Sequence, residues 1–285
     1  MAQAPNIVRT VAALRAQVRE WRASQLSIAM VPTMGALHEG HLSLCRLALE
    51  QADRLVVSIF VNPKQFAPTE DLSAYPRPFE ADVAKLQSIG THTVFAPAVD
   101  EIYPVNFSTL VHVGGVSEGL CAVARPPHFD GVSTVVTKLL LQCLPDVAVF
   151  GEKDYQQLQV IKRLVRDLDI PVEIIPGPTV REPDGLAMSS RNAYLTHNER
   201  GVAPMLYRVL QLLADAIKGG AIIELVIDQG IAALKSAGFD PIEYLELRDA
   251  EMLEPLTKLD RPARLLVAAR LGKTRLIDNI AVNPD

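Results

Sequence analysis

A run of seven mostly apolar residues, Leu55–Val61, constrains the fold of this chain more than any other segment. It reads Leu-Val-Val-Ser-Ile-Phe-Val, without the apolar–polar alternation of a strand that has one face in water. Such a run predicts a strand buried on both faces. Strands of this kind belong to parallel sheets, because the helical connections of a parallel sheet cover its faces. The segment therefore predicts an α/β fold.

The neighbouring segments alternate between strand and helix in the same way. Helical spacing is found at 41–51, 79–89, 132–143 and 155–168, and further short apolar strands are expected at 26–31, 93–96, 147–150 and 172–175. This alternation predicts a Rossmann-like parallel sheet with helices on both faces. Such a sheet binds its ligand beyond the carboxyl ends of its strands.

The alternation stops at Pro176-Gly177-Pro178, which is typical of a connection between domains. Two helical stretches follow, and then three strand-like segments, at 198–218, 222–236, 242–248, 264–269 and 275–281. Helices followed by strands predict a smaller α+β domain. We place the boundary near residue 180, with a Rossmann-like domain at 1–180 and a C-terminal α+β lid domain at 181–285.

Composition and charge exclude several classes of protein. The chain has 285 residues and a formal net charge of −5, with no basic stripe for nucleic acid. Its apolar runs are too short to span a bilayer, and no signal peptide is apparent. Cys45, Cys121 and Cys143 lack the spacing of a disulfide framework or a zinc site. We expect buried thiols in a cytoplasmic protein, with neither nucleic acid nor membrane as a partner.

Two histidines follow the first predicted strand, in the segment Pro32–His41. A helix start offers unpaired N–H groups and a positive dipole end, which attract phosphate. His38 and His41 are three residues apart, so they can point the same way and stabilise charge that grows on a phosphate. A capped helix with two exposed histidines is the structural alternative. The position of His-x-Gly-His directly after a strand favours nucleotide binding.

A second turn of this kind, Gly151-Glu152-Lys153-Asp154, follows the strand at 147–150. Lys153 is a mobile charge suited to ATP phosphates. Asp154 either caps the next helix or helps to hold a metal ion through water. Gln157 lies on the same side of that helix as Lys153. A second anion-binding turn in one sheet favours function over an ordinary capped helix.

Four other segments leave structural alternatives open. Gln65 follows the second strand, where its amide suits a substrate with hydroxyl groups and a carboxylate, or is simply solvated. Residues 67–78 form either a lid or a mobile surface loop. Arg125 and His128 face either the site or the solvent. Met188–Arg191 supplies hydroxyl groups and a guanidinium for pyrophosphate, or is a polar interdomain loop.

Together these segments resemble the pantothenate synthetase (pantoate–β-alanine ligase) family, nearly end to end. The His-x-Gly-His element alone marks a wider nucleotidyltransferase superfamily, which includes class I aminoacyl-tRNA synthetases. The combination is more specific, and it comprises Val31–Gly35, Asn62–Phe66, Gly151–Asp154, Met188–Asn192, Tyr244–Arg248 and Asp278–Ala281. Pro127 replaces a more common glycine, which leaves the path of the loop at 125–131 open.

The resemblance implies an ATP-dependent ligase that joins pantoate and β-alanine through a pantoyl-adenylate, releasing AMP and pyrophosphate, with Mg²⁺ as cofactor and unidentified Mg²⁺ ligands. It implies catalytic roles for His38, His41, Lys153 and Arg191, with His41 as an acid. Gln65 and Gln157 would bind pantoate, and Gln65 also β-alanine. The implied ATP-binding residues are Met34, Gly35, Ala36, Leu37, His38, Glu39, Gly40, His41, Gly151, Glu152, Lys153, Asp154, Val180, Met188, Ser189, Ser190 and Arg191.

The resemblance also implies a homodimer in the cytosol. The alternative function is a catalytically inactive, nucleotide-binding regulatory protein of the same fold. Retention of His41, Lys153 and Arg191 disfavours that alternative, because these residues serve the leaving-group chemistry. A tRNA synthetase is disfavoured by the acidic charge and the lack of an obvious anticodon-binding domain.

Overall fold

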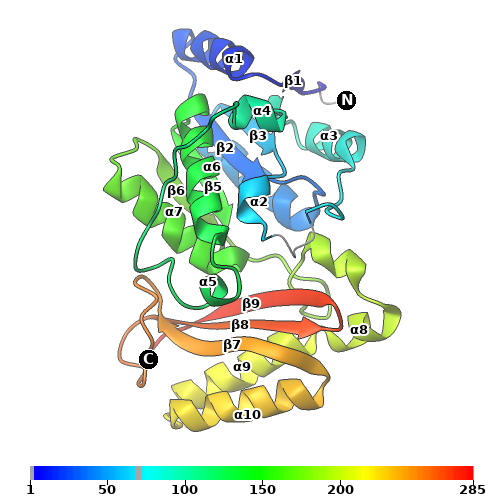
Figure 1. Ribbon diagram of the computed structural model, residues 1–285, viewed down its shortest axis with the longest axis vertical. Helices are drawn as coiled ribbons and strands as arrows, with labels where there is room; N and C mark the ends of the chain where they lie inside the picture. The colour runs from blue at the N-terminus through cyan, green and yellow to red at the C-terminus, as the bar shows by residue number, and fades with distance from the viewer. Residues whose placement is uncertain (1–2, 68–71, 285) are drawn as a thin grey trace.

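The computed structural model describes residues 3–67 and 72–284, which build two sheets (Figure 1). The larger sheet has the strand order β1-β4-β3-β2-β5-β6, and every pairing in it is parallel. The smaller sheet, β7-β8-β9, is antiparallel. The prediction of a Rossmann-like sheet followed by a smaller α+β region is confirmed.

The larger sheet and its connections occupy the first part of the chain. Its strands are β1 (Asn6–Val8), β2 (Ile28–Thr33), β3 (Arg54–Ile59), β4 (Thr93–Phe95), β5 (Val147–Gly151) and β6 (Glu173–Gly177). Its helices are α1 (Val11–Ala23), α2 (Glu39–Gln51), α3 (Phe79–Ser88), α4 (Val99–Ile102), α5 (Cys121–Ala124), α6 (His128–Cys143) and α7 (Tyr155–Asp167). Single turns of 3₁₀ helix, η1 (Pro63–Gln65) and η2 (Glu152–Asp154), follow β3 and β5.

The two faces of this sheet bury alternate side chains of the same strand. In β2, Ile28 and Met30 belong to the apolar cluster that includes residues of α1, α6 and α7. Ala29 and Val31 belong to the cluster on the other side, with residues of α2. This follows from the two-residue period of a strand. Because both sets are buried, the central strands appear in the sequence as continuous apolar runs.

Strand order reverses between β2 and β5. β3 and β4 lie to one side of this pair and β6 to the other, so the connections leave in opposite directions. In open parallel sheets such a reversal opens a crevice at the carboxyl ends of the strands. The turns that begin at Met34 and Glu152 follow these two strands, and the reversal brings them to the same crevice.

The smaller sheet is covered on both faces. It consists of β7 (Phe239–Asp249), β8 (Ala263–Leu271) and β9 (Thr274–Val282), and is preceded by η3 (Ser190–Tyr194), α8 (His197–Val202), α9 (Met205–Lys218) and α10 (Ile223–Ser236). Leu265 and Val267 pack in the cluster that includes residues of α9 and α10, whereas Leu266 packs in the cluster of the larger sheet. Figure 1 shows the sheet between these helices and the Rossmann-like region.

The structure differs from the prediction in several elements and boundaries. β1 and α1 precede the first predicted strand, and α6 begins at His128 rather than at 132. The helix predicted at 198–218 is two helices, because Pro204 cannot donate to the preceding turn. Residues 68–71 of the segment 67–78, for which the sequence left a lid and a surface loop open, lie outside the described residues. Within the described residues, no helix is long and apolar enough to cross a membrane.

Gly131 tests the contact between α6 and η1. A Cβ at Gly131 would lie 2.2 Å from the carbonyl oxygen of Lys64. We expect Gly131→Ala to lower the free energy of unfolding by about 1–3 kcal/mol, because backbone must move to relieve the clash. Gly201→Ala in α8 is the matched control, since its Cβ would meet nothing within 4 Å. Equal urea midpoints for the two variants would contradict this.

Candidate active site

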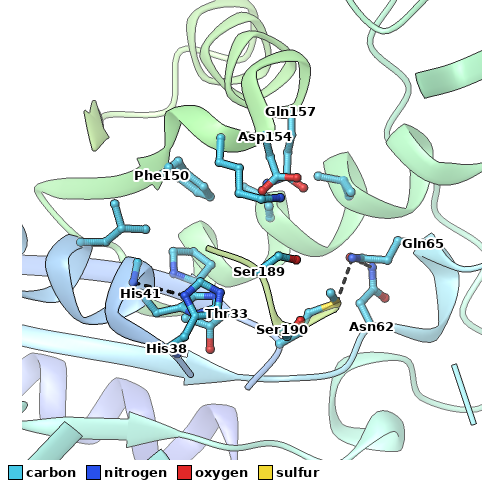
Figure 2. Close-up of a pocket in the computed structure, with 18 of the residues that line it drawn as sticks. Thr33, His38, His41, Asn62, Gln65, Phe150, Asp154, Gln157, Ser189 and Ser190 are labelled. Carbon is cyan, nitrogen blue, oxygen red and sulfur yellow. Dashed lines mark hydrogen bonds between the residues drawn. The ribbon is translucent and has the colours of Figure 1, made fainter. Parts of the chain in front are cut away.

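One pocket lies at the crevice and gathers residues from both parts of the chain (Figure 2). It includes the four predicted catalytic residues, His38, His41, Lys153 and Arg191. Further predicted binding residues also line it: Met34, Gly40, Gln65, Gly151, Asp154, Gln157, Val180, Met188, Ser189 and Ser190. The structure thus brings both phosphate-attracting turns, both glutamines and the Ser-Ser-Arg segment to one place.

Five residues predicted to bind ATP do not line this pocket, namely Gly35, Ala36, Leu37, Glu39 and Glu152. The side chain of Leu37 is buried in the core. Glu39 and Glu152 form ion pairs with Arg46 and Arg264. A part in ATP binding stays a prediction for all five.

His38 and His41 form the start of α2 with their own side chains. His38 Nδ1 accepts from the Gly40 N–H at 3.2 Å, and His41 Nδ1 accepts from the His38 N–H at 3.3 Å. The imidazole of His38 folds so closely over Gly40 that a Cβ there would lie 2.9 Å from His38 Cε1. Since each Nδ1 is an acceptor, each neutral ring carries its proton on Nε2. The Nε2–H groups are left to donate to a ligand.

Both rings are held in the neutral form. Burial and the charge of Lys153 lower the pKa of His38 to about 4. Burial and the neighbouring His38 lower the pKa of His41 to about 3. The ring centroids are 4.1 Å apart, so a proton on one ring disfavours a proton on the other. At neutral pH the pair therefore offers hydrogen-bond donors rather than positive charges.

Asp82 of α3 shapes the same turn, although its position in the sequence did not predict this. Its buried carboxylate accepts from the N–H of Ala36 at 2.7 Å and from the N–H of Leu37 at 2.8 Å. Lys85 donates to the carbonyl oxygen of Leu37 at 2.6 Å. The N–H groups of Ala36 and Leu37 are therefore already hydrogen-bonded within the protein. An acidic residue in a first helical turn fits an ordinary dipole interaction, so the sequence held no specific signal.

The second turn presents a cation beside a carboxylate. Lys153 and Asp154 of η2 both line the pocket. Burial alone would raise the pKa of Asp154, but the charges of Lys153 and Arg191 outweigh it and hold the pKa below its usual value. Within the described contacts the Asp154 side chain does not cap α7, so that alternative from the sequence is wrong.

Gln65 is held firmly at the other end of the pocket. Its side-chain oxygen accepts from Asn62 at 3.0 Å, and its Nε2 lies 3.0 Å from the sulfur of Met34. Its carbonyl oxygen accepts from Arg125 at 3.2 Å and lies 3.0 Å from His128 Nδ1. Arg125 and His128 therefore face the site, which settles the alternative that the sequence left open.

The Ser-Ser-Arg segment closes one side of the pocket. Ser189 accepts from the Arg191 N–H at 3.3 Å, and the hydroxyl groups of Ser190 and Tyr75 are 3.4 Å apart. Tyr75 is buried, so this part of the 67–78 segment already contacts the site. An apolar wall completes the pocket, formed by Phe60, Val132, Val135, Val136 and Leu139.

Comparison with known proteins identifies the family. The profile of the Pantoate-beta-alanine ligase family matches residues 6–281. The chain is 61% identical to a pantothenate synthetase from Paramagnetospirillum magneticum, over 100% of both chains. This chain belongs to the pantoate–β-alanine ligase family. Its relative from Rhodospirillum rubrum, also a pantothenate synthetase, is 57% identical over 97% of this chain and 98% of that one.

Solved structures of the family have the same fold. A pantothenate synthetase from Thermus thermophilus superposes with a TM-score of 0.92 at 45% identity, covering 98% of this chain and 100% of that one. A pantoate-β-alanine ligase from Francisella tularensis, complexed with β-γ ATP and β-alanine, gives a TM-score of 0.82 at 35% identity, with 97% of each chain covered. The family assignment thus rests on both sequence and fold.

Asp82→Asn tests the support of the first turn. An amide can accept from only one of the two N–H groups, so the other N–H loses its partner. We expect the free energy of unfolding to fall by about 1–3 kcal/mol, measured in urea. Glu80→Gln, an exposed change on the same helix, should leave the urea midpoint unaltered. If the two variants behave alike, Asp82 does not support the turn.

His41 should make stability depend on pH. Its pKa is lowered from 6.5 to about 3 in the folded chain, so below pH 6.5 the unfolded chain binds a proton that the folded chain does not. Stability is therefore complete above this pH and is lost as pH falls towards 3, by up to about 1.4 kcal/mol per pH unit. Urea unfolding measures how far the free energy of unfolding falls between pH 7 and pH 5.5. We expect this fall to be about 1 kcal/mol smaller in His41→Asn than in the unaltered protein. Parallel pH profiles would refute this.

Proposed function

We propose that this enzyme joins pantoate to β-alanine through a pantoyl-adenylate, consuming ATP and releasing AMP and pyrophosphate. The observation that carries the proposal is that two sets of side chains meet in one pocket. The first set is the two imidazoles, Lys153 and Arg191, and the second set is Gln65 and Gln157. The first set suits a nucleotide whose phosphate gains charge during displacement. The second suits a small hydroxy acid. Family membership gives the two substrates their identity.

In the first step a carboxylate oxygen of pantoate attacks the α-phosphorus of ATP. The bond from that phosphorus to the bridging oxygen breaks, and pyrophosphate leaves with the electron pair. Such a step needs aligned reactants and stabilised charge more than covalent help. We assign charge stabilisation to the Nε2–H groups of His38 and His41 and to the Lys153 ammonium. Because the imidazoles are neutral, His41 acts as a hydrogen-bond donor before it acts as any acid.

Pyrophosphate is assigned to the segment that closes the pocket. Ser189 and Ser190 carry hydroxyl donors, and the guanidinium of Arg191 can bind two phosphate oxygens at once. The Met188 backbone N–H already donates to the Val180 carbonyl oxygen at 3.0 Å, which steadies the segment. Val180 and Met188 line the pocket beside Gly40, where we place the nucleotide.

Pantoate is assigned to the end of the pocket that contains Gln65. Pantoate carries two methyl groups on one carbon, flanked by hydroxyl groups and a carboxylate. The apolar wall formed by Phe60, Val132, Val135, Val136 and Leu139 suits the methyl groups. The amides of Gln65 and Gln157 suit the oxygen atoms without repelling the carboxylate.

In the second step the amine of β-alanine attacks the acyl carbon of the adenylate. The amide bond forms, the bond from acyl carbon to phosphate oxygen breaks, the amine nitrogen gives up a proton to solvent, and AMP leaves with the electron pair. We place β-alanine beside Gln65, next to the acyl carbon. A pocket that excludes water protects the adenylate from hydrolysis before the amine arrives.

Mg²⁺ is proposed as the cofactor. Within the described residues, no group of three or more His, Cys, Asp or Glu side chains could hold a metal ion by itself. Asp154 is the carboxylate among the described lining residues. This donor set fits Mg²⁺, which commonly keeps several waters and binds substrate phosphates with one or two carboxylates. When bound, Mg²⁺ would neutralise phosphate charge.

We also propose a cytoplasmic homodimer in which residues 181–285 form a lid on the domain of residues 1–180. The support for the dimer is the family resemblance. Support for the compartment is the composition, together with three free and buried cysteines. Support for the lid is that Ser189 to Arg191 line the same pocket as His38 and His41.

Exchange of labelled pyrophosphate into ATP tests the reaction. We expect exchange that depends on pantoate and does not need β-alanine, because the adenylate forms first. His41→Ala should slow exchange by about 10²–10⁴-fold, with circular dichroism unchanged. Exchange driven equally by unrelated acids would rule out pantoate as the substrate. Absence of exchange with any acid would favour the inactive regulatory protein.

A further inference from the structure

The side chain of Asn279 on β9 reaches across to the turn that carries Lys153. Its Nδ2 donates to two consecutive carbonyl oxygens, of Glu152 at 3.0 Å and of Lys153 at 2.9 Å. Asn279 is buried, with 3% of its surface exposed. Both protons of the amide are therefore used on one turn of backbone.

The other end of the amide is fixed as well. Asn279 Oδ1 accepts from Arg264 Nε at 2.6 Å, and Arg264 also lies 3.2 Å from the carboxylate of Glu152. The guanidinium of Arg264 stacks over the ring of Tyr155, at 4.2 Å from the centroid. Because the guanidinium only donates, the oxygen of the amide must face it. The orientation of Asn279 is thus set from both ends.

The backbone beside Asn279 is anchored too. The Asn279 N–H donates to Asp278 Oδ1 at 2.7 Å. The carboxylate of Asp278 accepts two hydrogen bonds from Arg181, at 2.7 and 2.9 Å. Arg181 precedes the segment that carries Ser189 to Arg191. Adjacent residues of β9 therefore contact the Lys153 turn and Arg181, which lies upstream of Ser189 to Arg191.

The turn itself depends on this support. Within the described contacts, no side chain caps η2 at Gly151 or α7 at Asp154. The carbonyl groups of Glu152 and Lys153 point to the C-terminal sheet, where Asn279 satisfies them. The direction of a carbonyl group fixes its peptide plane and hence the direction of the adjoining side chain. Lys153 is a long side chain, so a small rotation of its backbone moves the ammonium far.

We propose that Asn279 is a positioning residue of this enzyme, which fixes the turn of Lys153 and so sets where the ammonium meets the nucleotide phosphates. The inference rests on the proposed role of Lys153. A displacement of about 1 Å can cost about 10²-fold in rate when reactants must be aligned. Asn279 is not among the residues that line the pocket, so its whole effect passes through Lys153.

A double-mutant cycle on pantoate-dependent pyrophosphate exchange tests this. We expect Asn279→Ala to lower kcat by about 10²-fold with little change in the KM for pantoate. The same substitution is then made in a Lys153→Ala background, where residual exchange is measured with excess enzyme. There we expect Asn279→Ala to lower kcat by less than about threefold. Asn279→Asp keeps the shape and the acceptor for Arg264 while losing the donors, and should behave as Asn279→Ala does.

Tyr244→Phe is the matched control. Tyr244 of β7 also contacts the Rossmann-like region, with its hydroxyl 3.1 Å from Cys121 Sγ, but the contact does not involve the Lys153 turn. We expect exchange within about threefold of the unaltered enzyme. A comparable loss in this variant would mean that any weakening of the interface slows exchange, and would overturn the inference.

Three other outcomes would also overturn it. The first is full exchange by Asn279→Ala. The second is a 10²-fold loss from Asn279→Ala in the Lys153→Ala background as well, which would show that Asn279 acts elsewhere. The third is intact exchange by Lys153→Ala itself, which would remove Lys153 from its proposed role. In that last case pantoate-dependent exchange by the unaltered enzyme would still support the proposed reaction, so the two failures are distinguishable.

Discussion

The reversal of strand order between β2 and β5 is the constraint on which the rest of the structure depends. It directs the turn after β2 and the turn after β5 to the same crevice, although these strands are more than 100 residues apart in the chain. Each turn alone is a common way to start a helix. Only their meeting places two neutral imidazoles opposite Lys153, and the apolar walls of α6 then give the crevice its closed end.

The electrostatics of the pocket follow from that meeting. Burial does most to lower the pKa of both histidines, and the charge of Lys153 adds to that effect. The same charge lowers the pKa of Asp154 against the effect of burial. A buried imidazolium pair beside Lys153 and Arg191 would concentrate positive charge in the pocket before a nucleotide binds. Neutral donors avoid that cost and still stabilise an incoming phosphate. The nucleotide itself would then raise the affinity of the rings for protons.

Much of the site could be predicted from the sequence because its signals are local. Histidines, glycines and a lysine directly after apolar strands identify both turns. Asp82 left no such signal, and Asn279 was marked only by the family resemblance of Asp278–Ala281, since each acts on backbone groups far along the chain. The helix α1 was missed although its signals are present: Thr10 caps it, and Leu14, Val18 and Trp21 form its buried face. Pro204 likewise marked the break that divides the predicted helix at 198–218.

The two turns differ in what holds them, and this difference divides the site between the two parts of the chain. The histidine turn is supported from within the Rossmann-like region, by its own imidazoles and by Asp82 of α3. The Lys153 turn is supported by β9, whose residues come last in the chain. Within the described contacts, the hydrogen bonds that support the first turn do not involve the C-terminal sheet, whereas those that support the second do. Correct docking of the C-terminal sheet is thus a condition for placing Lys153, not only for covering the pocket.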